Sequence, residues 1–269
     1  MTSLVDGVRE ETISVFDEGL LRGDGCFEAI RSYSGSPFAF IPHYQRLIRS
    51  AAALEIPCPP EQVLRAWVEE MAGEGGDCIV RIVLTRGSAA GLPSRCVVLW
   101  QALAPAAAQL RLLPIDAPWH PGGERWELTG VKTISYAPNM AASRLARKGG
   151  FDDALLVSRE GLVLEGPTFA VAWTRNGVIE TPARDLGILD SVTSRLLLHA
   201  AEADGRRVVN GRYSLADLGE ASEMVVMSTV KEVTAVIAVG EHRFSPGSLT
   251  NYLRSLYRDL VKQNERVRT

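Results

Sequence analysis

The feature that most limits how this chain can fold is a break in its pattern at residues 104–109, which read APAAAQ. Before this low-complexity stretch, runs with strand periodicity alternate with runs at helical spacing, and afterwards the pattern begins again with LRLLPI. The 269 residues are enough for two domains, each with a core of its own. We therefore predict an N-terminal domain over residues 1–104, a linker over 105–109 and a C-terminal domain over 110–269.

Both halves are expected to mix helices and strands, which makes the fold class α+β. In the first half we expect a strand hairpin at residues 26–35 with 37–44 and helices at residues 43–56 and 59–76. Two further strands are expected at residues 78–87 and 95–104. The second half is expected to be rich in antiparallel strands, at residues 153–158, 162–166, 169–174, 177–182, 222–229 and 233–240. One expected helix directly follows Lys132, and three more lie at residues 188–205, 214–222 and 249–263.

Charge and composition exclude several classes of protein. The net charge is −3 and the arginines are scattered among acidic residues, so no surface for nucleic acid is expected. The first residues lack a signal-peptide pattern, and no apolar run is long enough for a membrane span. The four cysteines form no CxxC pair and the four histidines are dispersed, which predicts reduced, buried thiols and no metal site. The expectation is a cytoplasmic globular protein.

Only four of the 29 basic residues are lysines: Lys132, Lys148, Lys231 and Lys262. A guanidinium stays protonated and cannot attack a carbonyl, whereas a desolvated amine can. Lys132 follows a short apolar run and precedes an alanine-rich helical stretch, a position that suits a Schiff-base lysine. A surface lysine that simply escaped replacement by arginine is the equally weighted alternative.

Other segments could complete a site around such an amine. Glu165 ends an apolar run, where a carboxylate is costly unless it is paired, although a turn residue is the plainer interpretation. The polar turn before Thr193 opens a helix whose N–H groups could bind phosphate or could merely cap the helix. A strand runs into Ser228 and Thr229, and Arg46 lies on a helix, where it could clamp a dianion or face solvent. Together these groups match the needs of pyridoxal phosphate: an amine, a carboxylate and several phosphate donors.

The chain resembles the fold-type IV pyridoxal-phosphate enzymes, the class IV aminotransferases, over nearly its whole length. Six blocks carry the resemblance in order: LLRGDGCFEAIRSY, HYQRLIRSA, VKTISYAPNMAASRLARKGGFDDALLV, LVLEGPTF, ETPARDLGILDSVTSR and VVMSTVKEVTAV. The resemblance implies a small N-terminal α/β sandwich domain, a larger C-terminal pseudo-barrel domain that carries Lys132, and pyridoxal 5′-phosphate as cofactor. It also implies a homodimer.

The resemblance implies a role for each matching residue. Lys132 is the Schiff-base lysine and proton-transfer group, and Glu165 pairs with the pyridine nitrogen. Leu189 packs under the cofactor ring. The residues implied to hold the phosphate are Arg46, Val192, Thr193 and Thr229.

Several positions depart from the family pattern. Ala170 stands where an asparagine is usual, and Arg195 is shifted by one residue from the usual Thr-Arg pair. Ile79 replaces the tyrosine that branched-chain enzymes carry before the mid-strand arginine, and Val230 replaces their alanine after threonine. The loop GSAAGLPS lacks the arginine and histidine of well-known D-amino-acid aminotransferases.

A substrate carboxylate needs a cation, and two loop arginines, Arg22 and Arg86, are the candidates for it. Arg31 and Arg81 lie mid-strand and are expected to form internal ion pairs. The residues expected to border the substrate side chain are Phe27, Ala29 and Val230.

The leading functional prediction is an aminotransferase that acts on D-amino acids, with (R)-amines as further donors and 2-keto acids as acceptors. The alternatives within the family are a branched-chain L-amino-acid aminotransferase and an aminodeoxychorismate lyase. A non-catalytic binding protein of this fold is an alternative of a different class, and Lys132 together with Glu165 argues against it.

Overall fold

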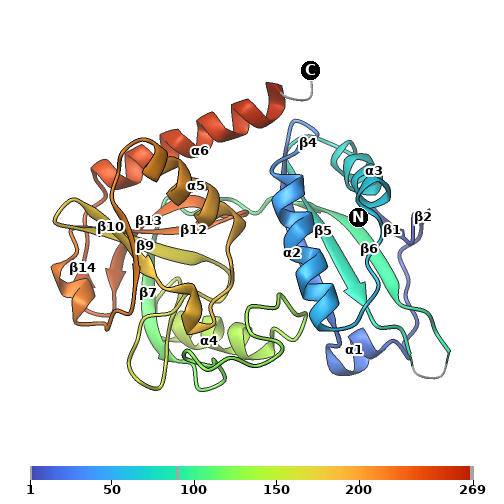
Figure 1. The fold of residues 1–269 in the computed structure, drawn as a ribbon, viewed down its shortest axis with the longest axis horizontal. Helices are drawn as coiled ribbons and strands as arrows, with labels where there is room; N and C mark the ends of the chain where they lie inside the picture. The colour runs from blue at the N-terminus through green and yellow to red at the C-terminus, as the bar shows by residue number, and fades with distance from the viewer. Residues whose placement is uncertain (1, 89–90, 267–269) are drawn as a thin grey trace. The chain divides into compact units, whose positions relative to one another are not determined.

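The computed structural model describes residues 2–88 and 91–266 (Figure 1). The chain forms two compact units. The first contains Met1–Ala104, Gly130–Tyr136 and the chain from Val261 onward, and the second contains Pro105–Thr129 and Ala137–Leu260. The segment that carries Lys132 therefore packs with the first unit, although the chain has already entered the second.

The first unit is built on a six-stranded sheet in the order β2-β1-β6-β5-β3-β4. Its elements are β1 (Ser3–Val5), β2 (Val8–Arg9), α1 (Glu18–Arg22), β3 (Gly25–Tyr33), β4 (Ser36–Pro37), α2 (Phe40–Ala53), α3 (Glu61–Ala72), β5 (Cys78–Thr85) and β6 (Arg95–Ala102). The strand pairs are all antiparallel. Two of the expected strands and both expected helices are confirmed as β5, β6, α2 and α3. The expected second limb of the hairpin is wrong, because only Ser36–Pro37 pairs with β3 and a helix starts at Phe40.

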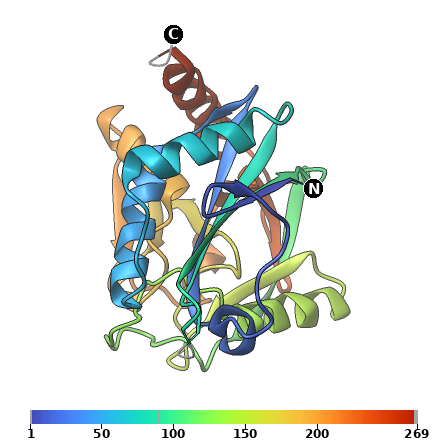
Figure 2. The ribbon, with the colours of Figure 1, turned by 90° about the vertical axis from the view of Figure 1, so that its right-hand side faces the viewer.

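Both long helices of this unit cover the sheet, and Figure 2 shows α3 crossing in front of its strands. One core contains the buried side of α2 and α3 together with alternate residues of the strands, among them Leu47, Val68, Ile30 and Ile82. Because side chains alternate along a strand, the even-numbered residues of β3 face the helices and the odd-numbered ones, including Phe27, face the other way.

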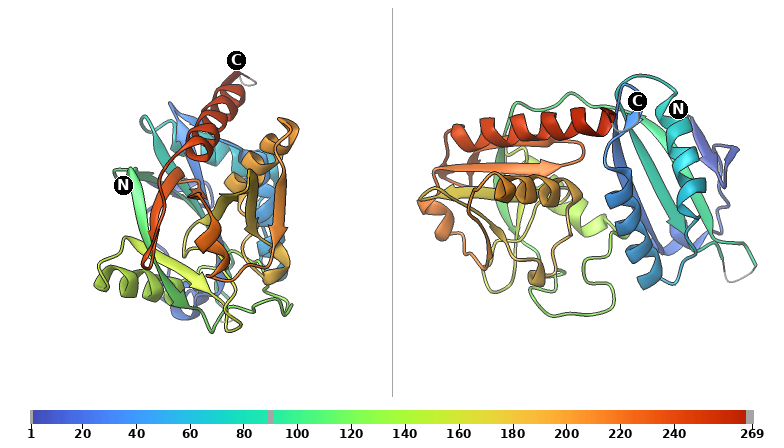
Figure 3. Two further views of the ribbon diagram at one scale, coloured as in Figure 1. Left: turned by 90° about the vertical axis from the view of Figure 1, so that its left-hand side faces the viewer. Right: turned by 45° about the horizontal axis from the view of Figure 1, so that its top comes forward.

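The second unit is built on an eight-stranded sheet in the order β11-β10-β9-β12-β13-β7-β8, with β14 beside β13. Its strands are β7 (Gln109–Asp116), β8 (Asp153–Val157), β9 (Ala170–Arg175), β10 (Val178–Pro182), β11 (Val208–Gly211), β12 (Glu223–Ser228), β13 (Glu232–Val239) and β14 (His242–Arg243). Its helices are α4 (Ala137–Lys148), α5 (Val192–Ala203) and the short 3₁₀ turns η1 (Arg184–Leu186) and η2 (Asp217–Glu220). The last helix, α6 (Ser248–Arg266), belongs to this unit up to Leu260 and to the first unit from Val261 onward. Figure 3 shows α5 and α6 beside these strands.

The central strands of this sheet are antiparallel, as expected, whereas β10–β11, β13–β7 and β7–β8 are parallel. The expected strand at 162–166 is wrong, because this segment forms only isolated bridges, such as Val157 with Val163. The expected helix at 214–222 is a 3₁₀ turn. Three cysteines are buried, while Cys58 is half-buried, and all four are free thiols. Within the described residues, no helix has the length and apolarity needed to cross a bilayer.

Candidate active site

Lys132 lies on a segment that extends the edge of the first unit's sheet. Its carbonyl accepts the N–H of Phe27 in β3 at 3.0 Å, and Thr133 forms an antiparallel bridge with Cys26. Its own N–H donates to Ser50 Oγ of α2 at 3.2 Å. The main chain of Lys132 is thus fixed by both a strand and a helix of this unit.

The amine of Lys132 lies against two aromatic rings. Nζ is 4.3 Å from the ring centre of Phe27 and 5.5 Å from that of Tyr136. Nζ is also 3.4 Å from the Tyr136 hydroxyl, and the two rings meet edge to face at 5.2 Å. This setting shields the amine partly from water, as a nucleophilic lysine requires.

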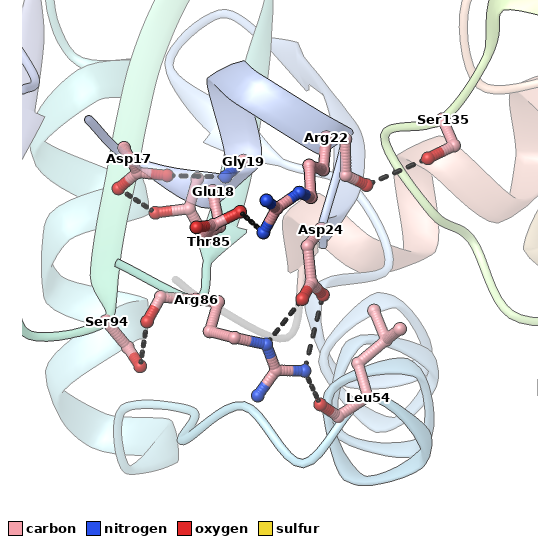
Figure 4. Close-up of polar contacts among 11 residues, drawn as sticks. Asp17, Glu18, Gly19, Arg22, Asp24, Leu54, Thr85, Arg86, Ser94 and Ser135 are labelled. Carbon is pink, nitrogen blue, oxygen red and sulfur yellow. Dashed lines mark hydrogen bonds and ion pairs between the residues drawn. The ribbon is translucent and has the colours of Figure 1, made fainter. Parts of the chain in front are cut away.

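Figure 4 shows the two arginines that were predicted to bind a substrate carboxylate. The expected loop position is correct for Arg86, which follows β5, but wrong for Arg22, which is the last residue of α1. Arg86 donates to the carboxylate of Asp24 and to the carbonyl of Leu54. Arg22 is 75% exposed at its side chain and pairs with Glu18 one helical turn earlier, at 2.8 Å. Each guanidinium is therefore bound to an acidic residue of its own unit, and for both arginines the carboxylate-binding role stays a prediction.

The mid-strand arginines differ from each other. Arg31 lies 3.6 Å from Asp77, which confirms the expected ion pair. Arg81 donates to Gln101 at 2.9 Å, and its guanidinium lies 5.1 Å from the ring centre of Phe27. For Arg81 the expected ion pair is wrong, because its described polar partner is this neutral amide. Burial lowers the pKa of the Arg81 guanidinium.

Phe27 therefore lies near two cationic groups of the first unit, the amine of Lys132 and the guanidinium of Arg81. The register of β3 with β5 places Ala29 directly opposite Arg81, so Ala29 lies on the same sheet face as Phe27. Phe27 and Ala29 were both predicted to border the substrate.

In the second unit, Glu165 lies 15% exposed at its side chain on the irregular segment after β8. Its Oε1 accepts the N–H of Leu189 at 3.1 Å, and His120 Nε2 lies 3.9 Å from the same oxygen. Its carbonyl accepts the N–H of Leu156 at 2.8 Å. Glu165 and Leu189, predicted to contact the nitrogen and the face of one ring, are thus in direct contact.

The start of α5 has the form of an anion-binding helix terminus. Ser191 is the N-cap, and its hydroxyl accepts the N–H of Ser194 at 3.3 Å. Val192 and Thr193 are the first helical residues, and both are buried. Arg195, which is shifted by one residue from the family's usual position, forms a local ion pair with Asp190 at 2.8 Å.

The turn between β12 and β13 contains the last two predicted residues. Thr229 is half-buried and Val230 is 41% exposed. The turn is fixed by Ser228, whose hydroxyl accepts the N–H of Lys231 at 3.0 Å. Ala170, which replaces the usual asparagine, pairs with Met227 just before this turn.

Several contacts at these residues were not foreseen from the sequence. Glu28 and His43 bind each other beside Arg46, Tyr136 contacts the amine, and His120 approaches Glu165. The sequence spacing could have indicated some of these contacts, because His43 and Arg46 are three residues apart on a helix and Tyr136 follows Lys132 by four residues. Nothing in the sequence links His120 to Glu165.

Comparisons with known proteins show the family to which the chain belongs. The model of the family described as amino-transferase class IV matches residues 25–239. A putative branched-chain-amino-acid aminotransferase of Methanocaldococcus jannaschii is 29% identical over 94% of this chain and 92% of its own. A bifunctional aminodeoxychorismate lyase/D-amino acid transaminase of Mycobacterium tuberculosis is 29% identical over 80% of this chain and 81% of its own. A fold IV-transaminase structure from Curtobacterium pusillum superposes with a TM-score of 0.90 at 28% identity, covering 98% of this chain and 99% of that one.

The chain belongs to the class IV aminotransferase family. It is a pyridoxal-phosphate-dependent transaminase with the fold-type IV architecture, as the sequence predicted.

The residues present suit this cofactor. The first unit supplies a partly shielded amine and a buried arginine. The second supplies a carboxylate beside a leucine and a capped helix start with buried N-terminal residues. These are the chemical groups that an aldehyde, a pyridinium nitrogen and a phosphate require.

Proposed function

We propose that this transaminase transfers amino groups between D-amino acids and 2-keto acids, with (R)-amines as further donors. The D-amino acid transaminase activity in the name of the Mycobacterium tuberculosis relative supports this substrate class. So does Ile79, which stands where branched-chain enzymes carry a tyrosine.

The observation that carries the proposal is the arrangement of Lys132, Phe27 and Arg81 on one side of the first unit's sheet. An amino acid presents an amine and a carboxylate on adjacent carbons, so its site needs a proton-transfer group and a cation close together. We propose Arg81 as a cation for this carboxylate beside the predicted Arg22 and Arg86, each of which already binds an acidic partner. Phe27, whose ring lies near both groups, would contact the substrate side chain together with Ala29 and Val230.

The remaining residues serve the cofactor. We assign its phosphate to Arg46, Val192, Thr193 and Thr229, and the face of its ring to Leu189. Glu165, as a carboxylate, keeps a proton on the ring nitrogen, and the bound cofactor supplies an aldehyde and an electron sink. With the cofactor bound, the Lys132 amine would act as the general acid/base that moves the proton of the substrate α-carbon.

We further propose that the active enzyme is a cytoplasmic homodimer. The start of the chain up to α1 exposes several large apolar side chains, which is typical of an interface. Their exposed fractions are 65% for Val15, 69% for Phe16, 61% for Leu20 and 57% for Leu21. Sedimentation at micromolar concentration should give twice the monomer mass, and Phe16→Glu should give the monomer.

The second candidate is a branched-chain L-amino-acid aminotransferase, which the name of the Methanocaldococcus jannaschii relative favours. A half-reaction panel separates the candidates. The holoenzyme is mixed with D-alanine, L-leucine or (R)-1-phenylethylamine, and the loss of the cofactor's visible absorbance is followed.

D-alanine should bleach the cofactor fastest. Arg81→Gln should slow the reaction with D-alanine at least tenfold but leave the carboxylate-free (R)-amine nearly unchanged, because about 1.4 kcal/mol of charge-assisted binding is lost. Arg31→Gln, on the same strand face as Ala29, is the matched control. A faster reaction with L-leucine would establish the second candidate, and pyruvate release from aminodeoxychorismate without bleaching would establish a lyase.

A further inference from the structure

A buried polar cluster of Glu28, His43 and Arg46 lies between β3 and α2 in the first unit. Glu28 Oε1 accepts from Arg46 Nε at 2.6 Å, and Oε2 accepts from Arg46 Nη2 at 2.7 Å. The same Oε2 contacts His43 Nδ1 at 2.8 Å. The side chains are 0%, 1% and 7% exposed for Glu28, His43 and Arg46. We call this group the Glu28 cluster.

Local structure alone brings the three residues together. Glu28 is an even-numbered residue of β3, so its side chain points to the helix-covered face of the sheet. His43 and Arg46 are one turn apart and lie on one face of α2. Ser50, one further turn along the same face, accepts the N–H of Lys132. The same face of α2 therefore contacts Glu28 and the segment that carries Lys132.

The charges in the cluster balance. Burial by itself would raise the pKa of Glu28, but the charge and hydrogen bonds of Arg46 and the His43 bond hold it well below its usual range. Burial, with the positive charges of Arg46 and Lys132, lowers the pKa of His43 although Glu28 accepts its hydrogen bond. His43 is accordingly neutral and donates its Nδ1–H to an ionised Glu28.

An arginine side chain is long and flexible, and a phosphate is bound best by a guanidinium whose plane is already fixed. Arg46 donates two parallel hydrogen bonds to Glu28, which fix that plane, and His43 fixes Glu28 in turn. The negative charge of Glu28 offsets the positive charge of Arg46 and so weakens the attraction of the cluster for a phosphate. Glu28 therefore serves to orient Arg46 and not to attract the phosphate.

We propose that Glu28 and His43 are positioning residues that hold the Arg46 guanidinium in the orientation that binds the cofactor phosphate. The inference rests on the proposed assignment of Arg46 to that phosphate. It assigns the two residues no contact with the substrate or with the reacting atoms.

The test compares the binding of pyridoxal 5′-phosphate and of pyridoxal, which lacks the phosphate, to the apoenzyme. The variants are His43→Phe, which keeps a ring but removes the donor, and His43→Asn, which keeps an N–H near the position of Nδ1. His43→Phe should weaken binding of the phosphorylated ligand about tenfold, the equivalent of one hydrogen bond to a charged group, and leave pyridoxal binding within about twofold. His43→Asn should restore most of the difference.

Two further variants keep the test decisive. Glu28→Asp preserves the charge but withdraws the carboxylate by one methylene, so it should lose the phosphate preference even if His43→Phe does not fold. Ser32→Ala, which removes a buried hydroxyl from the same face of β3, is the matched control and should keep the preference.

Equal weakening of both ligands in His43→Phe and Glu28→Asp would overturn the inference, because the cluster would then support only the fold. Unchanged binding of both ligands would overturn it as well. If the unaltered enzyme binds the two ligands equally, or if Arg46→Gln keeps the preference for phosphate, the assignment of Arg46 fails first and the inference falls with it.

Discussion

His43 links the stability of the protein to pH. Its pKa is lowered in the folded protein, chiefly by burial, from an ordinary value of 6.5. Below pH 6.5 the unfolded chain therefore binds a proton that the folded protein does not, so His43 makes the protein less stable as the pH falls. The advantage of the unaltered protein over His43→Phe in unfolding free energy should shrink by about 1 kcal/mol between pH 7.5 and 5.5. Urea unfolding at the two pH values measures it, and an advantage that grows on acidification would mean that folded His43 takes up the proton.

Arg86 and Arg22 should differ in what they contribute to stability. Arg86 ties together Asp24 and the carbonyl of Leu54, which are far apart in sequence, and its side chain is 37% exposed. Arg86→Ala should lower the unfolding free energy by about 1 kcal/mol, and Arg22→Ala should stay within about 0.5 kcal/mol. Urea titration of the two variants compares them directly. Equal effects would show that the contacts of Arg86 in Figure 4 add no stability.

At the scale of single residues, the sequence singled out candidate residues but did not show which contacts their side chains make. Lys132, Glu165 and Leu189 were singled out from motifs, and the structure places Glu165 in contact with Leu189. The Arg81 contact with Phe27 was missed, because a mid-strand arginine was assumed to find a carboxylate. Pairings such as Arg81 with Gln101 depend on sheet register, which a single sequence does not reveal.

At the scale of elements, the N-cap of α5 is the feature most open to a direct test. The Ser191 hydroxyl accepts the N–H of Ser194 and so leaves the first N–H groups of Val192 and Thr193 oriented outward from the helix start. Ser191→Ala should cost about 1 kcal/mol of stability and weaken binding of the phosphorylated cofactor. Ser191→Asp should keep the stability but weaken cofactor binding further, because it adds a negative charge beside the phosphate. Thermal unfolding and a cofactor titration separate the two effects, and tighter binding by Ser191→Asp would place the phosphate elsewhere.

The elements that sequence periodicity mispredicted have local causes. The apolar residues after the turn at Ser34–Ser36 suggested the second strand of a hairpin, but α2 starts at Phe40. Pro42 lies in the first helical turn, where its missing N–H costs nothing. The run 162–166 has the composition of a strand, yet its hydrogen bonds go to Leu156, Ser158 and Tyr213 in irregular positions. Periodic segments bounded by clear stop signals, such as α3, β5 and β12, were predicted correctly.

At the scale of the whole molecule, reading along the chain could not show that Gly130–Tyr136 returns to the first unit. The break at 104–109 marks the first crossing between units, because composition changes there. The later return depends on backbone pairing of Lys132 and Thr133 with β3, a long-range contact without a local signature. The domain limits expected from the sequence thus follow the order of the chain. They leave out the return of Gly130–Tyr136 to the first unit, which fixes the position of the Lys132 amine.

The central claim is that the Lys132 amine is the group that binds the cofactor aldehyde. The most direct measurement is borohydride reduction of the holoenzyme followed by peptide mass spectrometry. With only Lys148, Lys231 and Lys262 as other side-chain amines, the map is unambiguous. We predict a reduced pyridoxyl adduct on Lys132 alone, and neither an adduct nor activity in Lys132→Ala. An adduct on another lysine, or a holoenzyme with no reducible adduct, would contradict the account.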